Sequence, residues 1–392
     1  MMLKSKIFTI SLMLTSCFFV AVYLFDLGYI FHGVRSTYLR GERSAQIDDS
    51  EFFYNNDVVA NNPKKIPNAV GYEKNSITNK LNQLLEQTKS VAFLIVKDDS
   101  VSFEKYWDLG SVVSKTNSFS MAKSITSILV GCAIDDGFVG GVTQRVIDFF
   151  PQISSQGGEE LKIAHLLQMS SGMEWVENYK RPLSVTARAY YGTNLKKLIL
   201  GRRFSTKPGT VFHYKSGDTQ LLGLVLERAT GKSVADYAGE RLWTRIGATN
   251  NALWSVDYNG GVEKVFCCFN SNARDFSKLG LLVLNDGILY GDTIVSSDYI
   301  RWMTSPVGLL DRSGEKTTHY SNSWYYAKVL DKEVIYARGF LGQYIVVIPE
   351  INLVFVRLGK KENKNGGNKN KYRLTADLEI IINEVINMYS VK

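Results

Sequence analysis

The sequence has few of the residues that build metal centres. Its 392 residues include only four histidines, and these lie too far apart along the chain for any usual metal-ligand spacing. They are His32, His165, His213 and His319. His165 falls in an apolar helical segment, where a core or capping role is the more common one. We therefore expect no metal ion and no other cofactor.

Cysteine is equally scarce, with four residues in the whole chain. Cys17 lies in an apolar leader, and Cys132 lies in an apolar helical run where a small core residue fits. Cys267 and Cys268 are adjacent, and adjacent cysteines do not easily bridge each other. We expect no disulfide framework from this set.

The charge pattern excludes a further class of function. The formal net charge is +8, from 46 basic and 38 acidic residues, and part of the basic excess lies at the two ends of the chain. There is no basic helix and no nucleic-acid-binding motif, so we expect no nucleic-acid partner. A hydrophobic fraction of 45%, with 21 Tyr and 20 Phe, instead indicates a folded protein with a sizeable core.

The chain begins with a long apolar run. Residues 7–25 contain no charged side chain, and Lys4 and Lys6 precede them. Because a helix of roughly 20 apolar residues spans a bilayer, residues 1–43 are predicted to be a membrane anchor. A lipoprotein signal ending at Cys17 and a cleaved secretory signal are the alternatives. All three export the body of the protein, so we expect it outside the cytoplasm, on the periplasmic or extracellular side.

Hydrophobic periodicity predicts an α+β fold. A polar, extended lead-in over residues 44–76 is followed by one large domain over 77–392. Helices are predicted at 78–89, 120–136 and 375–388, and strands at 91–96, 101–107, 324–330, 333–338, 344–348 and 353–358. The middle of the chain reads as mainly helical, with candidates at 160–169, 193–200, 218–230, 233–244, 273–285 and 296–303. We therefore expect an antiparallel sheet flanked by terminal helices, an inserted helical region, and a site in the cleft between them.

A Ser-x-x-Lys pattern occurs three times, beginning at Ser102, Ser120 and Ser313. Ser102 lies in a predicted strand, where residues three apart point to opposite faces, and Ser313 lies in a polar loop. Only Ser120 opens a helix, which places Lys123 one turn away on the same face. The helix N-terminus favours an alkoxide on Ser120, and an apolar surround would lower the pKa of Lys123 so that it accepts a proton. A plain N-cap role for Ser120 is the alternative.

Two further segments can complete such a site. Tyr214 precedes a helix with Lys215 beside it, and a tyrosine between two cations shifts toward phenolate and can shuttle a proton. Tyr320, which precedes a strand, is its rival. Residues 339–343 contain two glycines, which let a backbone N–H approach a ligand as an oxyanion donor; a hairpin turn is the alternative. A Gly-x-Ser-x-Gly elbow, the signature of another class of serine hydrolase, is absent.

Five stretches together resemble the β-lactamase-related serine hydrolases, which include class C β-lactamases, penicillin-binding proteins and 6-aminohexanoate-dimer hydrolases. They occur in the family's order within roughly residues 75–390, at 118–124, 163–172, 208–216, 272–280 and 339–343. The resemblance implies Ser120 as nucleophile, Lys123 as its activator and Tyr214 as acid/base. It also implies an oxyanion hole from the N–H groups of Ser120 and Phe340. The oxyanion and substrate-binding residues would be Phe340, Ser216, Gly339, Gly342 and Gln343.

The sequence departs from the β-lactamases in two places. It lacks Lys-Thr-Gly on the substrate strand, where only Lys316 in a predicted loop comes close, and it has Ser216 where β-lactamases usually have Asn. The Gly-Gln ending of the strand at Gln343 is more similar to the 6-aminohexanoate-dimer hydrolases. Arg338 adds a positive charge to that strand, but the sequence leaves open where its side chain points.

We therefore predict an exported serine hydrolase that cleaves an amide or ester bond of a small molecule through an acyl-enzyme. The alternatives are a penicillin-binding peptidase acting on peptidoglycan, a β-lactamase, and an inactive relative that binds cell-wall material or a partner protein. The missing Lys-Thr-Gly disfavours the first two. The joint presence of Ser120, Lys123 and Tyr214 disfavours the last.

Overall fold

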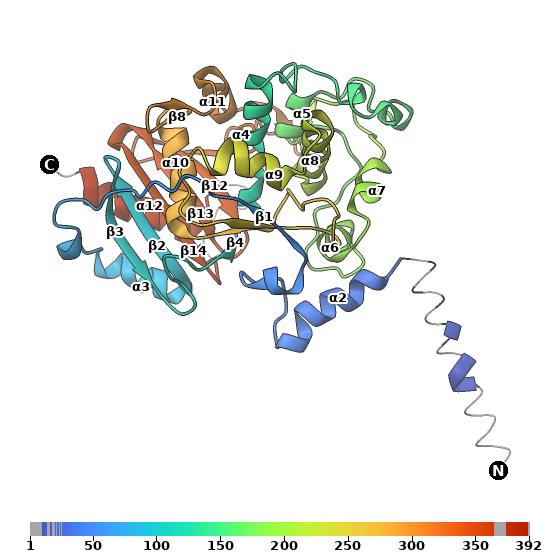
Figure 1. Ribbon diagram of the computed structural model, residues 1–392, viewed down its shortest axis with the longest axis horizontal. Helices are drawn as coiled ribbons and strands as arrows, with labels where there is room; N and C mark the ends of the chain where they lie inside the picture. The colour runs from blue at the N-terminus through green and yellow to red at the C-terminus, as the bar shows by residue number, and fades with distance from the viewer. Residues whose placement is uncertain are drawn as a thin grey trace, which may run out of the picture.

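A six-stranded antiparallel sheet forms one half of the protein, as the computed structural model shows (Figure 1). The structure describes residues 10–13, 16–17, 20, 22, 24, 26–363 and 374–390. The strand order is β11-β12-β13-β14-β2-β3. Their bounds are β2 Ser90–Lys97, β3 Ser100–Tyr106, β11 Tyr325–Val329, β12 Lys332–Gly339, β13 Gln343–Ile348 and β14 Leu353–Gly359. Two strands from early in the chain thus pair with four from its end, which confirms the predicted sheet.

Helices cover both faces of the sheet and form the second half of the molecule (Figure 1). They are α2 Gly28–Ser36, α3 Asn79–Gln87, α4 Met121–Asp135, α5 Ile163–Leu167, α6 Val185–Tyr191, α7 Leu195–Leu200, α8 Ser216–Thr230, α9 Val234–Ala238, α10 Ala273–Leu284, α11 Ser297–Thr304 and α12 Ala376–Ser390. All the predicted helices are present, and α2 and α6 were not expected. The α+β class with an inserted helical region is confirmed.

Strand β2 explains why the sheet is covered on both sides. Its side chains alternate between faces, and both sets are apolar. Phe93 and Ile95 join the cluster formed with α3 and α12, while Leu94 and Val96 join the main core. None of these four side chains is more than 1% exposed. A strand buried on both faces reads as a continuous apolar run, which is the pattern seen here.

The lead-in, residues 44–76, is part of the folded body. Its strand β1 pairs with β6 in a second sheet of order β1-β6-β7-β4. The bounds are β1 Asn55–Val58, β4 Thr116–Asn117, β6 Ala252–Ser255 and β7 Phe269–Ser271. Ile47 and Val58 are fully buried in the main core. Two short pairs complete the strands: β5 Val211–Phe212 with β10 Leu310–Asp311, and β8 Ile288–Leu289 with β9 Asp292–Thr293.

The last part of the predicted leader also folds onto the body. Helix α2 lies beside α6, and the ring nitrogens of His32 lie 2.8 and 3.1 Å from the carbonyl oxygens of Phe52 and Tyr191. Arg188 of α6 pairs with Asp26 at 2.5 Å. The apolar run over 7–25 lies largely outside the described residues. Within the described part of the chain, no helix has the length and apolar character to cross a membrane.

The expectation for Cys267 and Cys268 was wrong, because the two form a disulfide. In extended backbone, successive side chains point to opposite sides and two adjacent sulfurs cannot meet. Cys268 instead has a positive φ of 65°, which brings both sulfurs to one side of the turn before β7. Both residues are buried. Cys132 is buried and free, as the sequence indicated.

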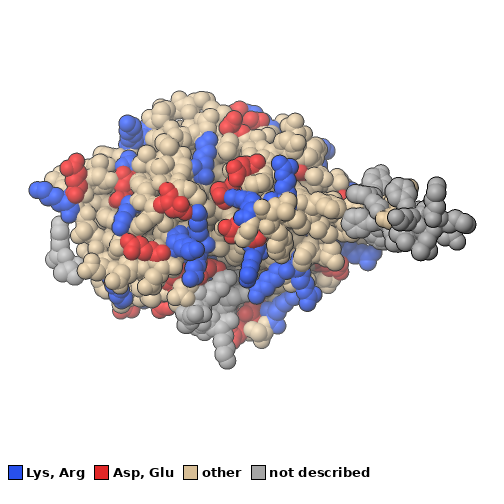
Figure 2. All heavy atoms as spheres, turned by 90° about the horizontal axis from the view of Figure 1, so that it is seen from below, with Lys and Arg blue, Asp and Glu red and all other residues tan. Residues whose placement is uncertain are grey.

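Charges of both signs are mixed on the face seen in Figure 2. Lys and Arg side chains there are interspersed with Asp and Glu side chains. Opposite charges at this spacing limit the reach of any positive field. Over the described residues of that face, the surface is therefore not the continuous basic one typical of nucleic-acid binding.

Candidate active site

Ser120 stands at the N-terminus of helix α4, where its hydroxyl is not used as a cap. The residue occupies the N-cap position, but its side chain accepts no hydrogen bond from the first turn. Instead, the Nζ of Lys123 donates to its Oγ at 3.1 Å. The capping alternative therefore does not describe Ser120, and its hydroxyl is paired with an amine one turn along the helix.

Lys123 is almost completely buried, with 2% of its surface exposed. Its Nζ also donates to the carbonyl oxygen of Phe266 at 2.8 Å, in the turn that carries the disulfide. Burial lowers the pKa of Lys123 to about 8, although the nearby charge of Glu177 acts in the opposite direction. The expected lowering is confirmed, and it makes the neutral amine accessible near physiological pH.

The backbone before Ser120 is held in an unusual conformation. Phe119 has a positive φ of 46°, which is uncommon for a bulky residue and is often found at functional sites. Its N–H donates to the Oδ1 of Asn117 at 2.8 Å, and that same oxygen accepts from the N–H of Cys268 at 3.1 Å. Asn117, which the sequence did not single out, therefore ties the segment before Ser120 to the turn beside Lys123.

Tyr214 is the tyrosine that lies against Lys123. The Lys123 Nζ is 5.0 Å from the centroid of the Tyr214 ring. Its sequence rival, Tyr320, packs edge-on against that ring with centroids 6.2 Å apart. Burial, followed by the charge of neighbouring tyrosines such as Tyr325, raises the pKa of Tyr214 well above its usual value. The expected shift toward phenolate is therefore wrong, since Lys215 turns its side chain away into a separate cavity.

Glu177 connects the elements around the site, and no sequence pattern pointed to it. Its carboxylate accepts from the N–H and Oγ of Ser216 at 2.8 and 2.7 Å. It also accepts from the Trp175 Nε1 at 2.7 Å and from the Tyr179 hydroxyl. Ser216, predicted as a substrate contact, is itself buried and held by this carboxylate. Glu177 thus positions Ser216, the first residue of α8.

Glu177→Gln is expected to move the acidic limb of the pH–rate profile to lower pH. The negative charge of Glu177 raises the pKa of Lys123, so removing the charge should lower that pKa further. The measurement is kcat/KM against pH for wild type and variant. Glu174→Gln, an exposed neighbour in the same loop, is the matched control and should leave the limb in place. An unmoved limb in Glu177→Gln would show that Lys123 does not titrate in it.

The hairpin between β12 and β13 lies directly against the segment that precedes Ser120. A Cβ on Gly339 would stand 2.1 Å from the carbonyl oxygen of Ser118, so only glycine permits this approach. Phe340, the predicted oxyanion donor, follows it and packs edge-on against Phe119 at 5.5 Å between centroids. The structure therefore brings Phe340 next to the segment that carries Ser120.

We expected Gly342 and Gln343 to contact substrate, and the structure instead places them in support of the hairpin. Gln343 is fully buried, and its amide donates to the carbonyl oxygens of Phe340 and Gly359 at 2.9 and 2.6 Å. Gly342 has a φ of 81°, and a Cβ there would overlap the Arg357 guanidinium. The Gln343 side chain is directed into the protein, and the Gly342 backbone packs against Arg357, which donates to its carbonyl oxygen at 2.6 Å.

Arg338 is held on the face of β12 opposite to that of Gly339. Side chains alternate along the strand, and Arg338 is paired in register with Tyr344 of β13. Its guanidinium pairs with Glu362 at 3.3 Å, and both side chains are mostly buried. Arg338 therefore does not replace the lysine of a Lys-Thr-Gly strand, and Lys316 lies exposed outside the main sheet.

Gly339→Ala is expected to destabilise the protein by about 1–3 kcal/mol, because the added methyl must displace backbone. The same displacement should lower activity, since Ser118 lies two residues before Ser120. Thermal unfolding and kcat/KM measure the two effects. Gly140→Ala is the control, since a Cβ there meets only the Gln144 side chain at 3.5 Å. Equal stability of both variants would contradict the close approach of β12.

The other two Ser-x-x-Lys motifs are not assembled as pairs. The Ser102 hydroxyl lies 2.7 Å from that of Tyr389, and Lys105 donates to Asn82. Ser313 donates to Asp311 in an exposed loop.

His165 caps helix α5, where its Nδ1 accepts from a backbone N–H at 3.2 Å, as expected. The described residues contain no group of three or more His, Cys, Asp or Glu placed to hold a metal ion.

The chain is similar to known proteins in sequence and in fold. Residues 77–379 match the protein family described as Beta-lactamase. A 6-aminohexanoate-dimer hydrolase from Paenarthrobacter ureafaciens is 25% identical over 237 residues, which are 56% of this chain and 58% of that protein. This chain therefore spans less than two thirds of that relative.

Solved structures share the fold at lower identity. A Bacillus anthracis protein assigned as a 6-aminohexanoate-dimer hydrolase superposes with a TM-score of 0.73 at 22% identity, covering 90% of this chain and 94% of its own. A family VIII carboxylesterase gives 0.59 at 17% identity, covering 80% and 98%. A penicillin-binding protein from Bacillus halodurans gives 0.60 at 14% identity, covering 79% and 100%.

Proposed function

The chain belongs to the beta-lactamase family and is a serine hydrolase, and we propose that it cleaves an amide or ester bond through an acyl-enzyme on Ser120. One observation carries this proposal. The hydroxyl of Ser120 lies 3.1 Å from the Nζ of Lys123, at a helix N-terminus and beside an amine whose pKa is lowered to about 8. A serine paired with a neutral amine is an activated nucleophile.

The first chemical step uses these two groups. Neutral Lys123 accepts the proton of the Ser120 hydroxyl as its Oγ attacks the substrate carbonyl. The N–H groups of Ser120 and Phe340 are the proposed donors to the resulting oxyanion. Donors placed where charge develops commonly supply the largest part of such catalysis.

Tyr214 is the proposed relay to the leaving group. Its raised pKa keeps it a neutral phenol, so it can donate a proton to the departing amine or alkoxide and recover one from Lys123. The acyl group then remains on Ser120. Water, deprotonated by the same pair, attacks the ester, and the carboxylic acid product leaves with Ser120 restored.

The substrate class follows from family membership and chain chemistry together. The relative in Paenarthrobacter ureafaciens is named for the 6-aminohexanoate dimer, and Arg338, the cation of β12 next to the hairpin, is already paired with Glu362. We propose a small linear amide or ester as substrate. We also propose that the uncharged run over 7–25 exports the body, which protease digestion tests on intact cells and on cells whose outer membrane has been permeabilised. A body that stays undigested in both would contradict export.

A panel assay tests the proposed reaction. The full chain in mild detergent is incubated with p-nitrophenyl esters, a linear ω-amino-acid amide and a fluorescent penicillin. We expect turnover of an ester or the amide, with an initial burst from the acyl-enzyme. A long-lived penicillin adduct without ester or amide turnover would instead support a peptidase acting on peptidoglycan.

A further inference from the structure

A cavity of about 490 Å³ lies on the other side of the Tyr214 segment. Its wall includes Lys215, the residue between Tyr214 and Ser216, but none of Ser120, Lys123, Tyr214 or Phe340. Because neighbouring residues in extended backbone point to opposite sides, Tyr214 meets Lys123 while Lys215 enters this cavity. One stretch of backbone therefore separates the cavity from the proposed catalytic centre.

Lys215 is an unusual buried cation. It is 2% exposed, and its nearest carboxylate oxygen, the Oδ2 of Asp218, is 3.9 Å away. That distance is too long for a hydrogen bond, and no acceptor in the described part of the chain lies within hydrogen-bond distance of its Nζ. Asp218 is itself engaged through its other oxygen by the Ser171 hydroxyl at 2.5 Å. A buried ammonium without acceptors is costly, and it is directed into an open cavity.

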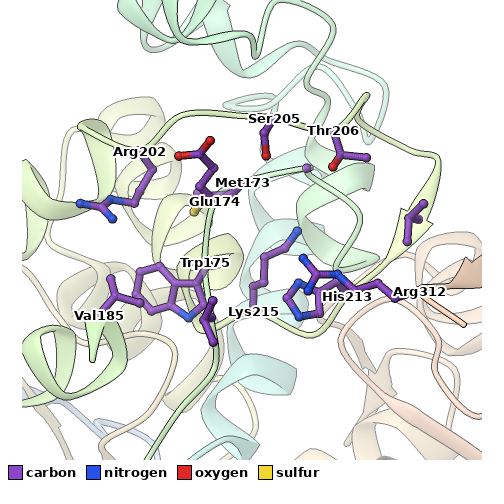
Figure 3. A pocket seen from close by; sticks show the side chains of 13 residues that line it. Met173, Glu174, Trp175, Val185, Arg202, Ser205, Thr206, His213, Lys215 and Arg312 are labelled. Atoms are coloured by element: carbon purple, nitrogen blue, oxygen red, sulfur yellow. The ribbon is translucent and has the colours of Figure 1, made fainter. Parts of the chain in front are cut away.

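The Arg312 side chain lies beside that of Lys215. Figure 3 shows the Lys215 and Arg312 side chains meeting at one end of the cavity, with His213 next to them. Like charges this close repel each other: burial lowers the pKa of Lys215, and the charge of Arg312 adds to that lowering. An anion between the two would remove the repulsion and supply the missing acceptors.

The rest of the lining fits a ligand with an apolar body. Trp175 and Val185 lie across the cavity from Lys215 (Figure 3), and the hydroxyls of Ser205 and Thr206 are placed on its rim. Among the lining residues, three are cationic and one, Glu174, is acidic. Mostly apolar walls with a few convergent polar groups are typical of small-molecule sites.

We propose that this cavity is a second ligand site, which binds the anionic group, carboxylate or phosphate, of a small molecule with an apolar body. Lys215 and Arg312 hold the anionic group, and Trp175 with Val185 holds the body. The site does not depend on the catalytic assignments, because no proposed catalytic residue lines it.

Isothermal titration calorimetry of the full chain at low ionic strength tests the site. The probes are pentanoate, inorganic phosphate and the neutral analogue 1-pentanol. Saturable binding of at least one anion, and none of 1-pentanol, is expected. Arg312→Gln and Lys215→Met should each weaken anion binding about tenfold or more, since each removes a charged hydrogen-bond partner. Tighter pentanoate binding indicates a carboxylate ligand, and tighter phosphate binding indicates a phosphate-bearing one.

Two control variants separate this site from its surroundings. Lys207→Gln removes an exposed cation nearby that does not line the cavity, and Ser120→Ala alters the catalytic centre; both should bind as wild type does. Arg312 is exposed, so Arg312→Gln is expected to fold. If Lys215→Met does not fold, the anion affinity of Arg312→Gln tests the proposal. No saturable anion binding up to about 10 mM, or equal affinity in wild type and Arg312→Gln, would overturn the proposal.

Discussion

Ser120→Ala should reduce kcat/KM for any ester or amide substrate by about 10⁴-fold or more, which is the scale of losing a serine nucleophile. The reason is that no other hydroxyl replaces it. Of the three Ser-x-x-Lys serines, Ser102 lies against the C-terminal helix and Ser313 lies in an exposed loop. The measurement is initial-rate kinetics with the best ester of the panel.

Ser313→Ala is the matched control for this loss. It removes a serine from the same motif without touching the site, so its kcat/KM should equal that of wild type. Circular dichroism and thermal unfolding confirm that Ser120→Ala folds, which we expect because its hydroxyl caps no backbone N–H. Residual activity above about 10% in a folded Ser120→Ala protein would refute the nucleophile assignment.

Lys123→Met should lower kcat/KM by about 10³-fold or more, because the alkoxide then has no acceptor for its proton. In wild type, the dependence of kcat/KM on pH should report the titration of Lys123. The pKa of Lys123 is lowered from 10.5 to about 8, so the amine is protonated and inactive as a base below that pH. The kcat/KM should therefore rise with pH and level off above about 8.

Lys123→Arg tests whether proton acceptance is the role of this side chain. An arginine keeps a positive charge but does not lose its proton, so the variant should be as inactive as Lys123→Met. Lys264, another buried lysine, has a pKa lowered to about 7. The Glu177→Gln variant shows which lysine titrates in the acidic limb of the pH–rate profile. The charge of Glu177 raises the pKa of Lys123, whereas the pKa of Lys264 depends on burial and on the charge of Asp257. Activity in Lys123→Arg would exclude a general-base role.

Most of the main sheet and the helix of Ser120 could be predicted from the sequence. Strands β2, β13 and β14 are buried on both faces, and each carries a run of at least four successive apolar residues. Helix α4 begins at a serine and ends before Gly137, and α3 begins after Thr78, whose side chain accepts from the Leu81 N–H at 3.1 Å. These signals are local, and local signals are what a single sequence carries.

The missed features depend on contacts between distant segments. Glu177 meets Ser216 across 39 positions of sequence, and its loop has no periodicity to draw attention to it. The disulfide required knowledge that Cys268 adopts a positive φ. The phenolate expectation for Tyr214 counted neighbouring cations along the chain, whereas burial decides its pKa. Gln343 was expected to contact substrate, and its burial depends on a turn that is formed only with Arg357.

The central claim is that Ser120 is a nucleophile activated by Lys123, and covalent labelling tests it most directly. The full chain in mild detergent is treated with a fluorophosphonate probe and analysed by intact mass, followed by peptide mapping, beside Ser120→Ala and Ser313→Ala. We expect a single adduct on Ser120 in wild type and in Ser313→Ala, and none in Ser120→Ala. No adduct on wild type, or equal labelling of wild type and Ser120→Ala, would contradict the claim and favour a relative that binds ligands without hydrolysing them.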